Sequence, residues 1–247
     1  MGNYTAVFEK SDLQFSNKDG VAKAVVNIYA RITSMSRRVV NVFEDTVTSE
    51  VSANLLEQAQ KGASIYQKSI PLAPGRYRLN MVVKDVIGGN MTNYEMALDV
   101  PRFEEDSLGM SSVILADLIE RVPTRSLGTG QFVIGGSKVR PRMDSSFKRG
   151  EKMGIYMQLY NFKADEKTNK PNASVDYEVV AKGSDKKIFE FSEEVAQVEG
   201  SSAAQYTIEK LLPLQSLDPG EYTLRMKVTD RNSKATLAPT VNFKVTE

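Results

Sequence analysis

Residues 74–85 read PGRYRLNMVVKD and residues 219–230 read PGEYTLRMKVTD, so one twelve-residue stretch occurs twice in the chain. Seven of the twelve positions are identical, and from Tyr77 onward the identical residues alternate with variable ones. A Pro-Gly turn followed by an apolar residue at every second position predicts a β-strand that leaves a tight corner and buries one face. The repeat therefore predicts two copies of one β-rich architecture.

Short alternating segments surround the repeat and are separated by turn-forming residues, for example at 16–20 and 88–90. About seven such segments in roughly a hundred residues are typical of an immunoglobulin-like sandwich. The stretch PRFEEDS at 101–107 has little apolar surface to bury. We therefore predict an all-β protein with two tandem immunoglobulin-like antiparallel β-sandwich domains. The first covers residues 1–101, a linker follows at 102–107, and the second covers residues 108–247 with extra elements at its start.

Two long predicted strands, at 21–33 and 152–162, also resemble each other. Ile28-Tyr29 in the first parallels Ile155-Tyr156 in the second, and both pairs lie within alternating apolar residues. We expect these two strands to occupy the same place in their domains.

The composition excludes several classes of function. Lys and Arg number 32 and Asp and Glu 31, so no strong field attracts nucleic acid or an anionic membrane. Histidine and cysteine are both absent, which removes imidazole and thiol catalysis, zinc–thiolate sites and ordinary transition-metal sites. We expect a protein without cofactors that is not an enzyme, although chemistry based on carboxylates, Ser or Lys stays open.

The chain holds no apolar run long enough to span a membrane, so we expect no membrane insertion. Met1-Gly2 stands directly before the first predicted strand, without the basic and apolar regions of a signal peptide. This favours either a cytoplasmic protein or a piece of something longer, and we prefer the second interpretation.

The repeated strand carries two pairs of candidate structural residues. Tyr77 and Tyr222 stand where a tyrosine corner would place a hydroxyl to bond nearby backbone. Asp85 and Asp230 close the same strands, and we expect them to accept backbone hydrogen bonds in the next turn. Ligand binding by the tyrosines and calcium binding by the aspartates are the alternatives, and one carboxylate per turn is too few for calcium.

Three further tyrosines, Tyr29, Tyr156 and Tyr160, are predicted to point away from the apolar rows of the long strands. Aromatic rings on an open sheet face could stack on sugar rings or on a partner protein, which makes these residues a possible interaction surface. The alternative is that they pack under a loop or against the neighbouring domain.

Charged clusters offer weaker signals. A basic strip could bind phosphate or polysaccharide, or could guard an exposed edge strand from pairing with other chains: Lys138, Arg140, Arg142, Lys148, Arg149 and Lys152. The acidic pair Glu193-Glu194 and the acidic run at 104–106 have polar surroundings, so we expect solvated surface. As catalytic carboxylates for glycoside hydrolysis they would need a cleft with aromatic walls.

Several stretches resemble the non-catalytic C-terminal half of bacterial GWxTD domain-containing proteins. The stretches that carry the resemblance are VFED at 42–45, YQK at 66–68, LAPGRYRL at 72–79, VKDV at 83–86, SSVILAD at 111–117, FKRGE at 147–151 and YN at 160–161. The Gly-Trp-x-Thr-Asp signature itself is absent because the chain has no Trp. The resemblance implies β-sandwich modules of an exported bacterial protein and implies no activity or functional residues.

Together these observations lead us to expect a non-enzymatic interaction or structural module of a larger exported bacterial protein, in the periplasm, at the cell surface or secreted. Its partner would be another protein or the N-terminal part of the same protein, and not nucleic acid. The alternative is a carbohydrate-binding module that binds a glycan through its tyrosine-bearing sheet face. A carboxylate-based hydrolase is a third hypothesis.

Overall fold

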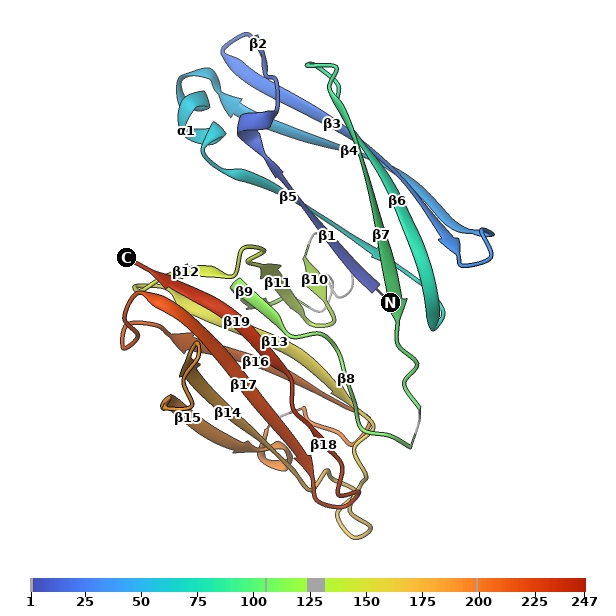
Figure 1. Ribbon diagram of the computed structural model, residues 1–247, viewed down its shortest axis with the longest axis vertical. Coiled ribbons are helices and arrows are strands. Elements are labelled where there is room, and N and C mark those ends of the chain that lie inside the picture. Colours follow the sequence, from blue (N-terminus) through green and yellow to red (C-terminus); the bar gives the residue numbers. More distant parts are fainter. Residues whose placement is uncertain (1, 105, 124–131, 199) are drawn as a thin grey trace. The chain divides into compact units, whose positions relative to one another are not determined.

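The computed structural model describes residues 2–104, 106–123, 132–198 and 200–247 (Figure 1). The chain divides into two compact units, Met1–Arg102 and Phe103–Glu247. Each unit is built almost entirely of β-strands that form facing, mainly antiparallel sheets. The prediction of two antiparallel β-sandwiches is confirmed. The boundary falls at the start of the stretch expected to be a linker, of which residue 105 lies outside the described residues.

Unit 1 places a two-stranded sheet over a five-stranded one. The small sheet pairs β1 (Gly2–Glu9) with β5 (Ala63–Ile70). The large sheet has the order β2-β3-β6-β7, and β4 also pairs with β3. Its strands are β2 (Ser16–Lys18), β3 (Val21–Ser34), β4 (Val39–Ser52), β6 (Gly75–Asp85) and β7 (Met91–Val100). Short helical segments lie at Lys10–Asp12, Ala53–Leu55 and α1 (Leu56–Gln60).

The core of unit 1 follows from strict alternation along its two longest central strands. On β3 every second residue from Ala22 to Ile32 is buried, and on β6 Tyr77, Leu79 and Met81 are buried. Tyr66 and Ile70 of β5 pack on this row from the other sheet. Alternation of this kind is what a strand with one solvated face requires.

Unit 2 is a larger sandwich of two sheets. One has the order β10-β11-β9-β13-β16 with β8 on β13, and the other has the order β12-β19-β17-β14-β15 with β18 on β17. The β12–β19 pair is parallel. The strands are β8 (Gly109–Met110), β9 (Ile114–Arg121), β10 (Val133–Ile134), β11 (Ser137–Pro141), β12 (Ser146–Lys148), β13 (Lys152–Tyr160), β14 (Ala173–Ala181), β15 (Lys187–Glu194), β16 (Gln205–Pro213), β17 (Gly220–Asp230), β18 (Thr236–Leu237) and β19 (Thr240–Thr246). A short 3-10 helix lies at Val195–Gln197.

The repeated stretch forms β6 in unit 1 and β17 in unit 2, and its neighbours show which strands correspond. β6 lies between β3 and β7, and β17 lies between β14 and β19. The expected match between the strand of Tyr29 and the strand of Tyr156 is therefore wrong, because β13 belongs to the opposite sheet and pairs with β16 as β1 pairs with β5. The two strands look alike in sequence because any half-buried strand alternates, whichever sheet it joins.

Candidate functional site

The tyrosines of the repeated strand make the same bond in both units. The Tyr77 hydroxyl donates a hydrogen bond to the carbonyl oxygen of Ala73 at 2.8 Å. The Tyr222 hydroxyl donates to the carbonyl oxygen of Asp218 at 2.6 Å. Both rings are buried, and each bond reaches back to the turn before the strand. This is the geometry of a tyrosine corner, which fixes the path of the chain where it enters the sandwich.

The aspartates at the other end of the repeated strand are also matched. Asp85 accepts hydrogen bonds from the backbone N–H of Gln14 at 2.8 Å and of Ile87 at 3.1 Å. Asp230 accepts from the N–H of Lys163 at 2.8 Å and of Asn232 at 3.0 Å. Each carboxylate thus ties its own turn to a loop from the facing side of the domain.

Burial alone would raise the pKa of Asp85, but the backbone N–H groups of Gln14, Gly88 and Ile87 lower it below its ordinary value. The described residues contain no group of His, Asp or Glu side chains that could hold a metal ion. Both aspartates therefore act as hydrogen-bond acceptors that hold backbone turns in place.

An ion pair joins the two sheets of unit 1 at one side of the sandwich. Lys68 of β5 donates to Asp45 of β4 at 2.8 Å, and the Tyr66 hydroxyl donates to the same carboxylate oxygen at 2.5 Å. Burial alone would raise the pKa of Asp45, but the bonds from Lys68 and Tyr66 lower it. Burial and the Asp45 bond raise the pKa of Tyr66. We call this arrangement the inter-sheet ion pair.

Unit 2 contains the same inter-sheet ion pair, built from different residues. Glu193 of β15 is bonded to Lys210 of β16 at 2.5 Å and accepts from the Tyr177 hydroxyl at 2.5 Å. The Glu193 side chain is only 12% exposed, so the expectation that this acid is solvated surface is wrong. The strand alternation places Glu193 on the inward face of β15, where Lys210 and Tyr177 compensate its charge. Burial and Glu193 together raise the pKa of Tyr177 and of Tyr206.

Tyr156 does not lie on an open face, which corrects the expectation that it could contact a ligand or a partner. It is 2% exposed and packs with Ala116 and Val139, which belong to β9 and β11. Its hydroxyl donates to the carbonyl oxygen of Ile134 at 3.4 Å, and burial followed by the nearby Glu209 carboxylate raises its pKa. The extra strands β9 and β11 cover the face of β13 that was predicted from the sequence to be open.

Tyr160 is half-buried at the end of β13. Its ring lies 5.2 Å from that of Phe103, and its hydroxyl donates to Gln158 at 2.6 Å. Burial raises its pKa. Tyr160 therefore packs against the loop segment before β8, which is one of the two alternatives expected for it.

Tyr29 is the one tyrosine of the three with a largely open ring. It is 40% exposed on the outward face of β3, where it lies opposite Glu44 of β4 and Val82 of β6. These residues, with Asn27 and Lys84, line a shallow surface depression. An aromatic ring surrounded by amide, carboxylate and ammonium groups has the chemistry to contact a sugar or a polar protein surface.

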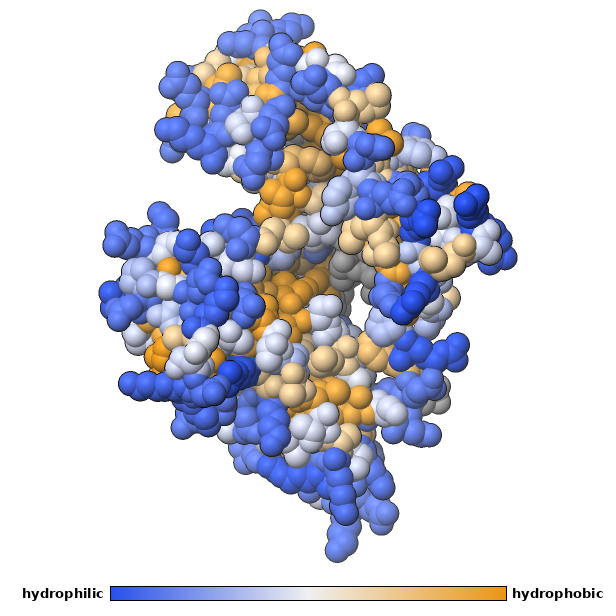
Figure 2. Space-filling model, in the orientation of Figure 1, coloured by the Kyte–Doolittle hydropathy of each residue, from blue (hydrophilic) through white to orange (hydrophobic). Residues whose placement is uncertain are grey.

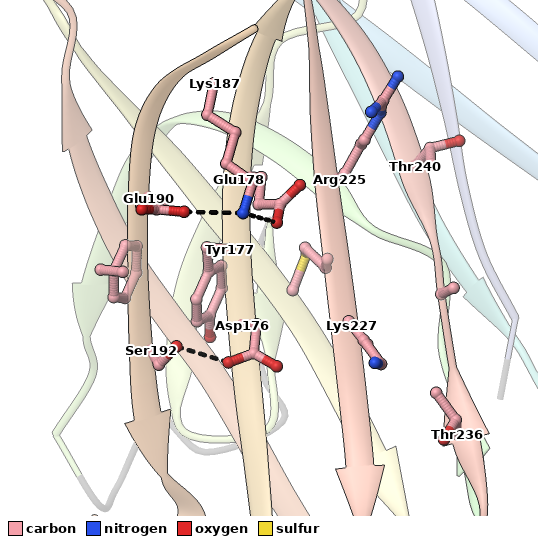
Figure 3. Close-up of a pocket in the computed structure, with 13 residues that line it drawn as sticks. Asp176, Tyr177, Glu178, Lys187, Glu190, Ser192, Arg225, Lys227, Thr236 and Thr240 are labelled. Carbon is pink, nitrogen blue, oxygen red and sulfur yellow. Dashed lines mark hydrogen bonds and ion pairs between the residues drawn. The ribbon is translucent and has the colours of Figure 1, made fainter. Parts of the chain in front are cut away.

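Unit 2 has a depression on the corresponding sheet face, over β15, β14, β17 and the β18–β19 edge (Figure 3). Its side chains carry both signs of charge, with acids on β14, cations on β17 and one of each sign on β15. Lys187 lies between Glu178 and Glu190, with distances of 2.7 and 2.8 Å to their carboxylate oxygens, and these bonds raise the pKa of Lys187. Ser192 donates to Asp176 at 2.5 Å. Sequence reasoning missed this face because its residues come from five strands, and β17 to β19 lie far along the chain from β14 and β15.

Two cations on β17 line the depression, and they differ in whether they form an ion pair. Arg225 is drawn away to Asp185 at 2.9 Å. Lys227 lies opposite Asp176 in the strand register and makes no ion pair among the described residues. The face thus presents both signs of charge, without an aromatic ring that is exposed to solvent.

The three arginines of the basic strip pair with neighbouring acids, whereas its three lysines make no ion pair among the described residues. Arg140 donates to Asp117 at 2.6 Å, and Arg142 donates to both carboxylate oxygens of Glu151 at 3.1 and 3.2 Å. Lys138 has strand neighbours on both sides, so it does not guard a free edge as expected. The strip holds β9, β11 and the chain before β13 together.

The surface of each unit is mixed in character. Figure 2 shows hydrophilic side chains over much of the visible surface, with apolar side chains gathered in smaller patches. Among the described residues no helix has the length and apolar character needed to cross a membrane.

Comparisons with known proteins identify no family for this chain. No protein-family model matches the chain, and no curated protein matches it. The solved structures that resemble it include a β-glucuronidase from Parabacteroides merdae, at 8% sequence identity and a TM-score of 0.31. That alignment covers 98% of this chain and 28% of the glucuronidase chain, so this chain spans little more than a quarter of that protein.

Proposed function

We propose that this chain is a non-enzymatic interaction or structural module of a larger exported bacterial protein, and that its main partner is another protein. The observation that carries the proposal is the repeated use of polar groups for internal bonding. Asp85 and Asp230 tie loops, and Asp45 and Glu193 join sheets, in matched positions of two units. Titratable groups committed in this way are stabilising elements and are not poised for proton transfer.

The outward sheet faces are the surfaces that stay free for binding. Both depressions lie on the sheet that contains the repeated strand, and both are shallow and lined by groups of mixed charge. A polar rim of mixed sign suits a protein partner, because complementary charges orient two surfaces without a strong net field.

A panel of chromogenic glycosides, esters and peptides tests the non-enzymatic part of the proposal. The chain and a Glu178→Gln/Glu190→Gln variant should give the same background rate with every substrate. Turnover by the parent chain that disappears in the variant would establish a carboxylate-based hydrolase instead.

A carbohydrate-binding module is the second candidate, and the exposed ring of Tyr29 favours it. Glycan binding through this face should be lost in Tyr29→Ala and kept in Tyr94→Ala, which removes an exposed tyrosine from the opposite face of the same sheet. A glycan array probed with the three proteins decides the matter. Equal signals from all three, or none, would remove the carbohydrate hypothesis.

A further inference from the structure

Unit 1 leaves one side of its sandwich uncovered. Among the described residues β1 pairs with β5 alone, and β7 pairs with β6 alone. β5 lies over β4, because Lys68 and Tyr66 reach Asp45. β1 is therefore displaced toward the β6–β7 end, and the free edges of β1 and β7 border the same side (Figure 1).

Large apolar side chains are exposed on that side. Tyr94 and Met96 lie on the inward face of β7, opposite the buried Met81 and Leu79 of β6. Nevertheless Tyr94 is 60% exposed and Met96 is 40% exposed. Inward-facing residues of a closed sandwich are normally covered by the other sheet, so this part of the core lacks its cover.

Unit 2 shows what covers the equivalent place. There β8 and β9 pair antiparallel with β13, on the edge that does not pair with β16. The pairs include Met110↔Leu159 and Leu115↔Ile155. Leu115 is buried in the core, and Leu108, Met110 and Val113 pack against it. β12 adds to β19 on the other sheet. β1 corresponds to β13. In unit 1, however, no described strand pairs with the edge of β1 that corresponds to the β8 and β9 edge of β13.

We propose that unit 1 binds an extended segment of a partner protein, which adds antiparallel to the free edge of β1 and lays apolar side chains over Tyr94 and Met96. The inference rests on the proposed function and names the chemistry of its partner. A free strand edge offers a row of unpaired N–H and C=O groups, which is the basis of binding by strand addition. Apolar side chains at alternate positions would face the uncovered core.

Charge further defines the partner segment. β1 ends at the exposed Glu9 and contains no Lys or Arg, whereas Glu95 and Asp99 of β7 lie on the outward face and already pair with Arg78 and Arg76. A segment with basic residues at its N-terminal end complements this edge, because antiparallel pairing with β1 brings that end beside Glu9.

The chain itself supplies a probe with this chemistry. A synthetic peptide with residues 107–117, SLGMSSVILAD, preceded by two lysines, copies the strand that fills the place in unit 2. Hydrogen exchange of the full chain is followed while this peptide is titrated to about 1 mM. We expect saturable binding that slows exchange about tenfold or more along residues 5–9 of β1.

Matched variants assign the binding to this side. Met96→Lys should weaken peptide binding about tenfold or more, and Met35→Lys, at an exposed methionine elsewhere in unit 1, should leave it unchanged. A peptide with Ile114→Asp and Leu115→Asp should not protect β1. Unchanged exchange along β1 at the highest peptide concentration, or equal binding by Met96→Lys, overturns the proposal.

Analytical sedimentation without peptide tests whether a second copy of the chain occupies this side. A dimer that Met96→Lys dissociates would show that a second copy covers this side, which also overturns the proposal. Failure of strand binding leaves the non-enzymatic module intact, since the substrate panel tests that separately. Turnover in the panel would contradict the proposed non-enzymatic function, and it would not affect the result of the peptide titration.

Discussion

Asp45 and Glu193 occupy the same position in the two units. Asp45 lies opposite Ile28 in the register of β4 and β3, and Glu193 lies opposite Val175 in the register of β15 and β14. Both carboxylates bond a lysine from the facing sheet and a tyrosine hydroxyl. They differ in burial, because the Asp45 side chain is 31% exposed and that of Glu193 only 12% exposed.

The difference in burial predicts unequal costs for one substitution. Lys210→Met leaves Glu193 buried without its cation and should destabilise unit 2 by about 3 kcal/mol or more. Lys68→Met leaves Asp45 with partial access to water and should cost unit 1 about 1 kcal/mol. Urea unfolding, followed by hydrogen exchange in β16 and in β5, measures the two effects. Lys23→Met, which breaks the exposed Lys23–Glu50 pair, is the control and should change little. Equal costs at the two lysines would contradict the argument from burial.

The tyrosine corners predict separate effects on the two units. Tyr77→Phe and Tyr222→Phe each remove one hydroxyl bond to a backbone carbonyl and should cost about 1 kcal/mol. Each loss should appear only in the unit that carries the substitution, because the sites share no partners. The exposed Tyr94→Phe is the control. A loss in both units from one substitution would show that they unfold together.

The carboxylates of unit 1 predict acid sensitivity. In the folded protein the pKa values of Asp45 and Asp85 lie below the ordinary 3.8. Groups of this kind stabilise fully above their unfolded pKa and lose that contribution as the pH falls through the folded pKa. Unit 1 should therefore lose stability as the pH is lowered below 3.8, and Asp85→Asn should flatten this dependence. Urea midpoints as a function of pH, with the exposed Asp99→Asn as control, test the sign. A steeper dependence in Asp85→Asn would be the opposite result.

Gly154 predicts a steric requirement beneath the extra strands of unit 2. A Cβ at this position would lie 2.8 Å from Cδ1 of Ile119 and 3.1 Å from the carbonyl oxygen of Ala116. Gly154→Ala should therefore cost about 1–3 kcal/mol through overpacking between β13 and β9. Gly150→Ala, where no atom lies within 4 Å of the added carbon, is the matched control. Thermal unfolding of both variants compares their stability directly. Equal unfolding midpoints would show that β9 shifts to accommodate the added methyl group without loss of stability.

The fold was predictable because alternation and turn chemistry are local signals. The repeat around Tyr77 and Tyr222 identified two sandwiches, and each copy forms a strand with the same buried row. Sheet membership was not predictable for the strands of Tyr29 and Tyr156, because a half-buried strand has the same pattern in either sheet. Only strand pairing, which is non-local, distinguishes β3 from β13.

The candidate surface was only partly predictable, for a related reason. The openness of a sheet face depends on what later strands lay over it, as β9 and β11 do over Tyr156. The acid at Glu193 had polar sequence neighbours, yet its partner Lys210 lies on a separate strand of the other sheet. Spacing carries no signal for this pair either, because 23 positions separate Asp45 from Lys68 and 17 separate Glu193 from Lys210.

The hydroxyl donor of the inter-sheet ion pair changes strand between the copies. β5 provides Tyr66 where β16 has Ile208, and β14 provides Tyr177 where β3 has Ala30. A hybrid that joined β3 to β16 would offer the carboxylate no hydroxyl, and one that joined β14 to β5 would crowd two tyrosines around it. Recombination within the repeats is therefore costly, because the hydroxyl that completes each ion pair would be lost or doubled.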